Sequence, residues 1–276
     1  MTLVSFVVPT KNAERTIAAC LRSLRDQHTR PGAVEGHAVE TQVVVVDNFS
    51  DDRTADIARS YADIVAVAGP ERCRQRNLGA ELASGEILVF IDADMVLEPT
   101  IALEIADAIV EQGLDYLVLP ELAFGESFFA RCRALEKELY LGDPTVEAGR
   151  AIRRSLFEQV GGWDETLTAG EDWELSDRLV AAGAKLGRVE SRVWHDEGVV
   201  RLRTQFRKKR YYGAWVADFV RRGGSDHLAR TALFSQPKRL AAQPALTAGL
   251  FTLKGVEAAG LATGMAGTWV RQRAGR

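Results

Sequence analysis

Two carboxylates, Asp92 and Asp94, come directly after the apolar run Ile87–Ile91. Such a run predicts a strand that is buried on both faces. In an extended chain, side chains two positions apart point to the same side, so both carboxylates are expected together at the carboxyl end of this strand. Open α/β sheets bind ligands at that edge. Two hard oxygen ligands there suit Mg2+ or Mn2+ that carries a diphosphate.

Two other expected strand ends add polar groups to the same edge. The first strand ends in Pro9-Thr10-Lys11-Asn12, and the all-valine strand Val43–Val46 ends at Asp47. Backbone and polar groups there are suited to hold a base and a ribose, with Asp47 accepting a hydrogen bond from a base N–H. The alternative is that Asp47 and Ser50 only cap a turn.

Three arginines, Arg72, Arg74 and Arg76, start the helix that is expected before the acidic strand. A guanidinium at that place can donate hydrogen bonds to a diphosphate oxygen. Alternate positions on a helix do not face one direction. At most two of these arginines can therefore take part in one site, and at least one is an ordinary solvated side chain.

The second half of the chain contains paired glycines and an acidic helix start. Gly161-Gly162-Trp163 allows a tight backbone approach to a ligand. Glu171 and Asp172 are expected at a helix N-terminus, where Asp172 is either a general base aimed at an acceptor hydroxyl or a plain cap of the helix N–H groups. Trp163 and Trp173 suggest a platform for stacking a sugar. His195, at the end of a later strand, is either structural or a ligand.

Strands and helices alternate with short links over about residues 1–120, which predicts a mainly parallel α/β sheet covered by helices on both faces. The second part is expected to be mixed, with a long basic and aromatic helix near its end. The expected strands are Val4–Val8, Val43–Val46, Ile64–Ala68, Ile87–Asp92, Tyr116–Leu119 and strands near 185–194. The expected helices are Ala13–Arg25, a helix from about Thr54, Arg72–Ala83, about 100–112, 127–140, 155–160, 172–182 and 204–222, with further helix in Leu228–Arg276 and a loop at 26–41.

The charge is unevenly distributed. Residues 1–200 hold 20 Lys and Arg against 35 Asp and Glu, whereas residues 201–276 hold 15 against 3. A basic tail on an acidic body indicates a polyanionic partner or docking of the tail on the body. The three cysteines are widely spaced and form no metal-binding pair, and no leader precedes the first strand, so a cytoplasmic protein with reduced thiols is expected.

The C-terminal region combines aromatic and basic residues. In 204–222, Tyr211, Trp215 and Phe219 recur at helical spacing among arginines and lysines, which is typical of a helix at a membrane interface. The alternative is an aromatic core stripe with a solvated basic face. In 240–270 the charges Lys254 and Glu257 leave apolar pieces too short to span a bilayer, so paired helices or a monotopic anchor are expected. An anionic membrane surface and a polyprenyl-linked or other lipid-linked acceptor then follow as hypotheses.

Five motifs occur in a specific order between about Val4 and His195: V-S-F-V-V-P-T-K-N, V-V-V-D-N-F-S-D-D, R-N-L-G-A-E-L-A-S-G-E-I-L-V-F-I-D-A-D, G-G-W-D-E and G-E-D-W-E-L. In this order they resemble the motifs of family 2 glycosyltransferases. The resemblance implies the GT-A fold over 1–200, with a nucleotide-binding half at 1–120 and an acceptor half at 121–200, followed by the basic helical region 201–276. The implied activity is inverting transfer of a sugar from a nucleotide-diphosphate sugar donor, with Mn2+ or Mg2+.

The resemblance also implies roles for particular positions. Asp172 matches the catalytic base, and Asp92, Asp94 and His195 match metal-binding positions. Residues expected to bind the nucleotide sugar are Pro9, Thr10, Asn12, Asp47, Arg76, Asp92, Ala93, Gly162, Trp163 and Glu171. Arg207-x-x-Arg210-Tyr211 only approximates the Gln/Arg-x-x-Arg-Trp motif of processive members, so a polymer synthase is not expected.

Other functions fit the sequence less well. A nucleotidyltransferase needs a Gly-rich loop after the first strand, where this chain has Pro9-Thr10-Lys11-Asn12. There is no Walker loop or GxGxxG motif for an ATPase or a dinucleotide enzyme. No nucleic-acid-binding motif accompanies the basic tail, and no nucleic-acid partner is expected. A non-catalytic nucleotide-sugar-binding or membrane scaffold protein is the alternative to the transferase.

Overall fold

The computed structural model describes residues 1–28, 38–143, 146–221 and 236–274. The chain forms two compact units. The first unit comprises Met1–Glu121, Ala148–Thr166 and Asp172–Asp196, and the second comprises Leu122–Glu147, Leu167–Glu171 and Glu197–Arg276.

A seven-stranded sheet forms the centre of the first unit. Strands β1, β2, β3 and β4 run parallel, whereas β8 pairs antiparallel with both β4 and β6. In spatial order the strands are β3 (Ile64–Val67), β2 (Val39–Asp47), β1 (Thr2–Thr10), β4 (Ile87–Phe90), β8 (Gly149–Arg153), β6 (Tyr116–Val118) and β9 (Leu186–Arg188). The mainly parallel, mixed sheet therefore agrees with the sequence prediction.

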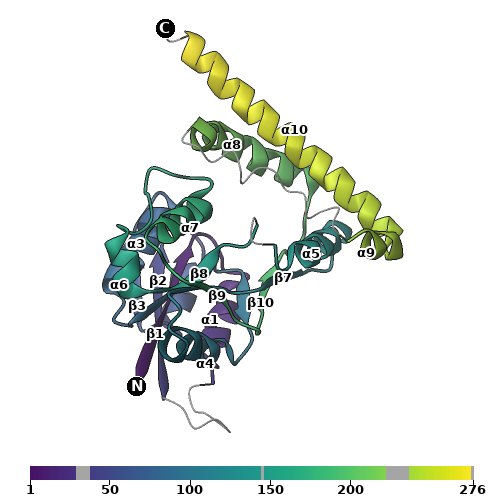
Figure 1. Ribbon diagram of the computed structural model, residues 1–276. Helices are drawn as coiled ribbons and strands as arrows, with labels where there is room; N and C mark the ends of the chain where they lie inside the picture. The colour runs from purple at the N-terminus through teal and green to yellow at the C-terminus, as the bar shows by residue number, and fades with distance from the viewer. Residues whose placement is uncertain (29–37, 144–145, 222–235, 275–276) are drawn as a thin grey trace. The chain divides into compact units, whose positions relative to one another are not determined.

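Helices cover both faces of this sheet (Figure 1). Successive residues of a strand point to opposite faces, so Phe6 and Val8 pack against one helical layer and Val7 against the other. The first layer holds α1 (Ile17–Arg25), α2 (Thr54–Arg59) and α4 (Ile101–Ala106), which continues as the π-helical turn η1 (Asp107–Glu111). The second layer holds α3 (Arg72–Leu82), α6 (Arg154–Gln159) and α7 (Glu171–Ala181).

Several element boundaries differ from the sequence prediction. Strand β4 ends at Phe90, and three strands that were not expected follow: β5 (Met95–Leu97), β7 (Glu121–Phe124) and β8. β5 pairs antiparallel with β10 (Val193–Asp196). Helix α1 begins at Ile17 rather than Ala13, because Ala13 to Thr16 form a turn closed by the Thr16 N–H and the Ala13 carbonyl. β2 already begins at Val39, inside the expected loop, and residues 29–37 lie outside the described part of the chain.

The second unit is mostly helical. It contains most of β7 (Glu121–Phe124), then α5 (Phe128–Tyr140), α8 (Leu202–Arg221), α9 (Pro237–Ala242) and α10 (Pro244–Ala274). Leu250 and Leu253 of α10 are fully buried against residues of α5, including Cys132, Leu135 and Ala130. α8 runs beside α10, which is drawn in yellow in Figure 1.

The C-terminal helices match the expected helical content where the structure describes them. Residues 228–235, expected to be helical, lie outside the described part, as do the side chains of Val216, Phe219 and Val220. Tyr211 is exposed and Trp215 is half-buried. None of the described helices is long and apolar enough to cross a membrane.

Candidate active site

The ends of β1 and β2 are tied together by polar contacts. Pro9 and Thr10 lie in register with Val46 and Asp47. The Asp47 carboxylate accepts hydrogen bonds from the backbone N–H and the hydroxyl of Ser50. Asp47 therefore does cap the turn after β2, which was the alternative to a base contact. The base contact stays a prediction.

Asn12 connects the β1 loop to the same turn. It has a left-handed backbone, with φ 49°, which asparagine tolerates better than most residues. Its backbone N–H donates to the Ser50 hydroxyl over 2.8 Å, and its side-chain oxygen accepts from the Asp51 N–H over 3.1 Å. Nearby, the Thr10 hydroxyl is buried and has no hydrogen-bond partner among the described residues.

Arg76 links the acidic strand end to helix α7. Its side chain is 1% exposed, and its two terminal nitrogens lie 3.1 Å from Asp92 Oδ1 and 3.1 Å from Asp172 Oδ1. The guanidinium stacks on the Trp163 ring, 4.5 Å from its centroid. Of the three arginines of α3, Arg76 alone points inward, whereas Arg72 and Arg74 are exposed. The structure thus brings Arg76, Asp92 and Asp172 together, and three predicted residues share one network.

The two aspartates of the acidic motif do not share an extended backbone, so that prediction was wrong. Residues after β4 turn sharply, and the Met95 N–H donates to the Asp92 carbonyl over 3.0 Å. Asp92 consequently faces Arg76 and Arg150, whereas Asp94 faces His195. Burial disfavours the ionised form of Asp92, but the charges of Arg150, Arg76 and Arg72 outweigh burial and hold its pKa far below the usual range.

His195 lies between two carboxylates. Its Nε2 is 3.1 Å from Asp94 Oδ2, and its Nδ1 is 2.9 Å from Glu121 Oε1. Burial favours the neutral ring, but the hydrogen bonds to Asp94 and Glu121 dominate and raise the pKa of His195 to about 10. β10 supplies the histidine and the turn after β4 supplies Asp94.

Arg150 and Glu121 complete this network, and the sequence analysis did not find them. Arg150 lies 3.5 Å from Asp92 Oδ2 and 3.3 Å from Glu121 Oε2, so it joins Asp92 to the carboxylate that holds His195. Its side chain is largely buried on β8. An arginine inside a strand of the central sheet was the available signal, but β8 itself was not recognised.

The glycine and tryptophan motif serves packing. Gly162 has φ 70°, and a Cβ there would lie 2.8 Å from Asn77 Oδ1. That amide is needed where it is, because it accepts from the Trp163 N–H over 2.9 Å and donates to the Trp163 carbonyl over 2.9 Å. Trp163 is 3% exposed and contacts Phe90 edge-on. Its burial leaves no open indole face for a sugar, whereas Trp173 is half-buried.

The remaining predicted residues lie close to this network in sequence. Ala93, between the two aspartates, is buried. Glu171 is buried at the first position of α7, so the helix start predicted at Glu171 and Asp172 is confirmed. Their binding roles stay predictions.

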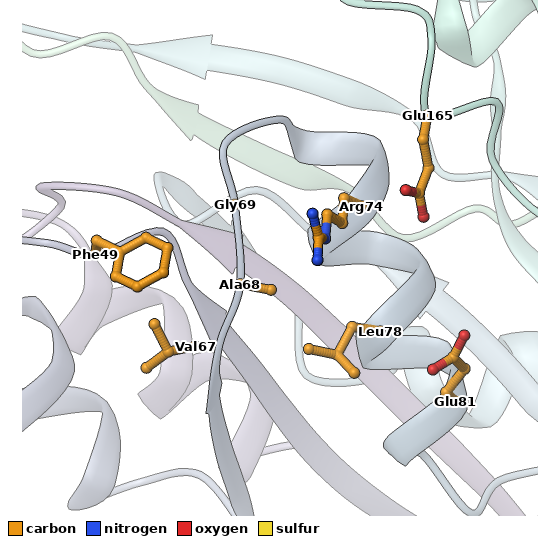
Figure 2. Close-up of a pocket in the computed structure, with 8 residues that line it drawn as sticks. All are labelled: Phe49, Val67, Ala68, Gly69, Arg74, Leu78, Glu81 and Glu165. Carbon is orange, nitrogen blue, oxygen red and sulfur yellow. The ribbon is translucent and has the colours of Figure 1, made fainter.

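A separate pocket of about 330 Å³ lies on the outer side of α3 (Figure 2). Figure 2 shows Phe49 and Val67 facing Arg74 and Leu78 across it. Its lining residues are Phe49, Val67, Ala68, Gly69, Arg74, Leu78, Glu81 and Glu165. None of these is a predicted site residue, so the pocket is distinct from the carboxylate and arginine network.

A mainly parallel sheet with an acid-rich carboxyl edge, joined to a helix that begins with a carboxylate, is the arrangement of α/β folds that bind ligands at that edge. The model of the family described as glycosyl transferase family 2 matches residues 5–160. The chain therefore belongs to glycosyl transferase family 2, and the resemblance seen in its motifs is confirmed.

Two curated bacterial proteins are similar to this chain over most of its length. A pre-mycofactocin glycosyltransferase of Mycobacterium tuberculosis is 29% identical over 246 residues, covering 78% of this chain and 47% of the relative. The succinoglycan biosynthesis protein ExoA of Rhizobium meliloti is 27% identical over 201 residues, covering 65% of this chain and 58% of the relative. The chain thus spans about half the length of these relatives.

Solved structures confirm the fold class. A mannosyltransferase of Pyrobaculum calidifontis, solved with GDP-Man and Mn2+, superposes with a TM-score of 0.59 at 20% identity, covering 95% of this chain and 79% of that one. TarS 1–349 of S. aureus, solved with UDP-GlcNAc, superposes with a TM-score of 0.53 at 18% identity, covering 99% of this chain and 92% of that one. At these identities the likeness establishes the GT-A fold alone.

Proposed function

We propose that this chain is an inverting glycosyltransferase that moves a sugar from a nucleoside-diphosphate sugar to an acceptor hydroxyl or phosphate. The observation that carries the proposal is the double ion pair of Arg76, which lies 3.1 Å from Asp92 and 3.1 Å from Asp172. One buried guanidinium thereby couples the acidic donor motif to the carboxylate proposed as the base. The glycosyltransferase name of the Mycobacterium tuberculosis relative supports the same reaction class.

Asp172 is proposed as the general base. Arg76 donates to Oδ1, so Oδ2 is the oxygen suited to receive the proton of the acceptor hydroxyl. As the acceptor oxygen bonds to the anomeric carbon, the bond to the diphosphate oxygen breaks and the nucleoside diphosphate leaves with the electron pair. A single displacement of this kind inverts the anomeric configuration. General-base assistance typically contributes about 10²- to 10⁴-fold.

Asp94 and His195 fit a divalent ion. Asp94 Oδ2 and His195 Nε2 lie 3.1 Å apart and would supply a hard and a borderline donor, with the ion displacing the proton that the raised pKa of His195 keeps on the ring. No group of three or more His, Cys, Asp or Glu side chains in the described ranges forms a metal site by itself. Two protein ligands are sufficient for Mg2+ or Mn2+, since such ions commonly take their other ligands from phosphates and water. When bound, the ion would supply a positive charge for the diphosphate leaving group.

The arginines complete the donor side of the proposal. Arg76 and Arg150 place two permanent positive charges beside Asp92, where a diphosphate would otherwise meet only carboxylates. The predicted nucleoside contacts at Pro9, Thr10, Asn12 and Asp47 lie at the ends of the neighbouring strands β1 and β2. The buried Thr10 hydroxyl without a partner among the described residues supports a ligand contact there.

The proposal extends to the acceptor and its setting. A polyprenyl-linked or other lipid-linked acceptor, met by a peripheral protein at the cytoplasmic face of a membrane, suits the basic C-terminal region. A non-catalytic protein that only binds nucleotide sugars is the competing function. The two differ in whether a bound donor is ever cleaved.

The test is donor binding and slow donor hydrolysis across a panel of nucleotide sugars, each with Mn2+, Mg2+ or EDTA. We expect one donor to bind and to release its nucleoside diphosphate only with a divalent ion. Donor binding without hydrolysis or transfer to any acceptor would favour the non-catalytic protein. Folded protein that binds no donor at all would overturn the proposal.

A further inference from the structure

The charged side chains that the structure describes on helix α10 lie on its inner face. Lys254 and Glu257 are the only charged residues between Pro244 and Gly267, the stretch of α10 whose side chains the structure describes. Lys254 Nζ lies 2.7 Å from Glu136 Oε1 of α5 and 2.8 Å from Glu257 Oε2. A helix on the surface of a water-soluble protein normally shows the opposite pattern, with its charges on the outer face.

Every charge of this inner cluster is paired. Arg133 of α5 contacts Glu136 at 2.5 Å and also bonds to Glu257. Glu136 and Glu257 each have side chains 3% exposed. Burial disfavours the ionised Glu257, but Arg133, Lys209 and Lys254 outweigh burial and lower its pKa to about 2. The charges of α10 are thus fixed towards α5 and are not available to its outer face.

Between Pro244 and Gly267, the outer face of α10 carries no charge. It shows Ala248, Phe251, Ala258, Ala262 and Met265, with Phe251 41% and Met265 37% exposed. Even its hydroxyl groups are satisfied within the helix, because Thr252 donates to the Ala248 carbonyl over 2.9 Å and Thr263 donates to the Ala259 carbonyl over 2.7 Å. Polar groups that bond within their own helix suit a surrounding without water.

α10 also packs on α8 at very short range. A Cβ on Gly264 would lie 2.1 Å from the Arg210 carbonyl oxygen, and a Cβ on Gly213 would lie 2.3 Å from the Leu261 carbonyl oxygen. The small residues at this contact let the two helix backbones approach closely, so α8 and α10 form one packed pair.

α8 supplies a row of positive charges. Arg203, Arg207 and Arg210 are exposed, and their spacing of four and three residues places them on one helix face. A second copy of the same pair of helices would bring such rows together, and like charges would repel. An anionic surface would complement them.

From these features we infer that the charge-free face of α10 lies in the interface of an anionic lipid bilayer, with the arginine row of α8 bound to lipid headgroups. No described helix can cross a membrane, so α10 lies along the surface. This inference deepens the membrane setting of the proposed function, and its test is separate from that of sugar transfer, because it concerns a different part of the chain and a different ligand.

Flotation with lipid vesicles tests the inference on the full chain. We expect the protein to float with vesicles of phosphatidylcholine and phosphatidylglycerol. With vesicles of phosphatidylcholine alone, the protein should remain in the bottom fraction. Phe251→Glu combined with Ala262→Glu should abolish flotation. Val110→Glu is the matched control, because Val110 is also 41% exposed but lies in the first unit, and it should float like the parent chain.

A second variant tests the charges separately. Replacing Arg203, Arg207 and Arg210 with glutamine should lower partitioning about a hundredfold, since each cation near an anionic surface contributes about fivefold. Circular dichroism reports whether each variant is folded. Absence of flotation by the folded parent chain, equal loss in Val110→Glu, or a stable dimer that Phe251→Glu dissociates would each overturn the inference.

Discussion

Two clusters of arginine and carboxylate groups in this chain differ in how far their carboxylates are exposed to solvent. In the second unit, Arg133, Glu136, Lys254 and Glu257 bond to one another, and both glutamates are almost fully buried. In the first unit, Asp92, Asp94 and Asp172 have side chains 22%, 42% and 39% exposed. Arg150 Nη1 there is buried and forms an ion pair with Asp92 Oδ2 over 3.5 Å, without a hydrogen bond to any described residue.

The difference separates a structural cluster from a reactive one. A saturated buried network holds helices in one arrangement and has no capacity left for a ligand. An open network, whose carboxylates reach solvent and whose Arg150 makes only a long ion pair with Asp92, can still bind a ligand. Similar residue types therefore serve packing between α5 and α10 and, by our proposal, chemistry at the carboxyl edge of the sheet.

The largest effect is expected from Asp172→Asn. The amide cannot accept the acceptor proton, so turnover should fall by about 10²- to 10⁴-fold while donor binding persists. Release of nucleoside diphosphate in the presence of acceptor measures turnover, and calorimetry measures donor binding. Asp177→Asn, on the exposed side of the same helix, is the matched control and should leave turnover unchanged. Full turnover by Asp172→Asn would remove this residue from the role of base.

Most of the sheet could be predicted from the sequence, because its inner strands are uninterrupted apolar runs. Val43–Val46 and Ile87–Ile91 can only be strands covered on both sides, and the structure places them in β2 and around β4. Strand β8 was missed because Gly149, Arg150 and Arg153 break its apolar pattern. Those arginines have partners in space, namely Asp92 and Glu121 for Arg150, and no local pattern reveals them.

The site was predictable in its members and less so in its geometry. Arg76, Asp92 and Asp172 were expected and meet in one network. Asp92 and Asp94 were expected to point the same way, but a turn separates them, because the chain reverses from β4 into the short strand β5. Glu121 has no neighbouring motif, and only the fold shows it beside His195.

Arg133→Met should cause the largest loss of stability. It leaves Glu136 and Glu257 buried with Lys254 as their remaining partner in the cluster. Breaking a buried ion pair on one side costs about 3–5 kcal/mol, measurable by urea denaturation. Arg59→Met is the control, because Arg59 and Asp56 form an exposed pair, and it should cause no measurable change. If both variants lost a similar amount of unfolding free energy, burial of the cluster would contribute little to stability.

Glu121→Gln should weaken metal binding and leave the fold intact. Glu121 orients His195 through Nδ1, so that Nε2 points at Asp94. Removing such an orienting carboxylate typically costs about 10- to 100-fold in metal affinity. Electron paramagnetic resonance of free Mn2+, titrated with protein and nucleoside diphosphate, measures this directly. Glu81→Gln, an exposed glutamate on α3, is the control, and equal affinities in the two variants would contradict the orienting role.

The smallest effect is a difference in acid stability. The pKa of Glu257 is about 2 in the folded protein, below the ordinary value of about 4.3. Because the folded pKa is depressed, the ionised carboxylate stabilises the fold above about pH 4.3, and this contribution is lost as pH falls towards 2. The stability gap between the parent chain and Glu257→Gln should therefore narrow over that window, as denaturation at several pH values would show. A gap that stays constant would mean that Glu257 contributes through packing rather than through its charge, and the saturated cluster would then resemble an ordinary core.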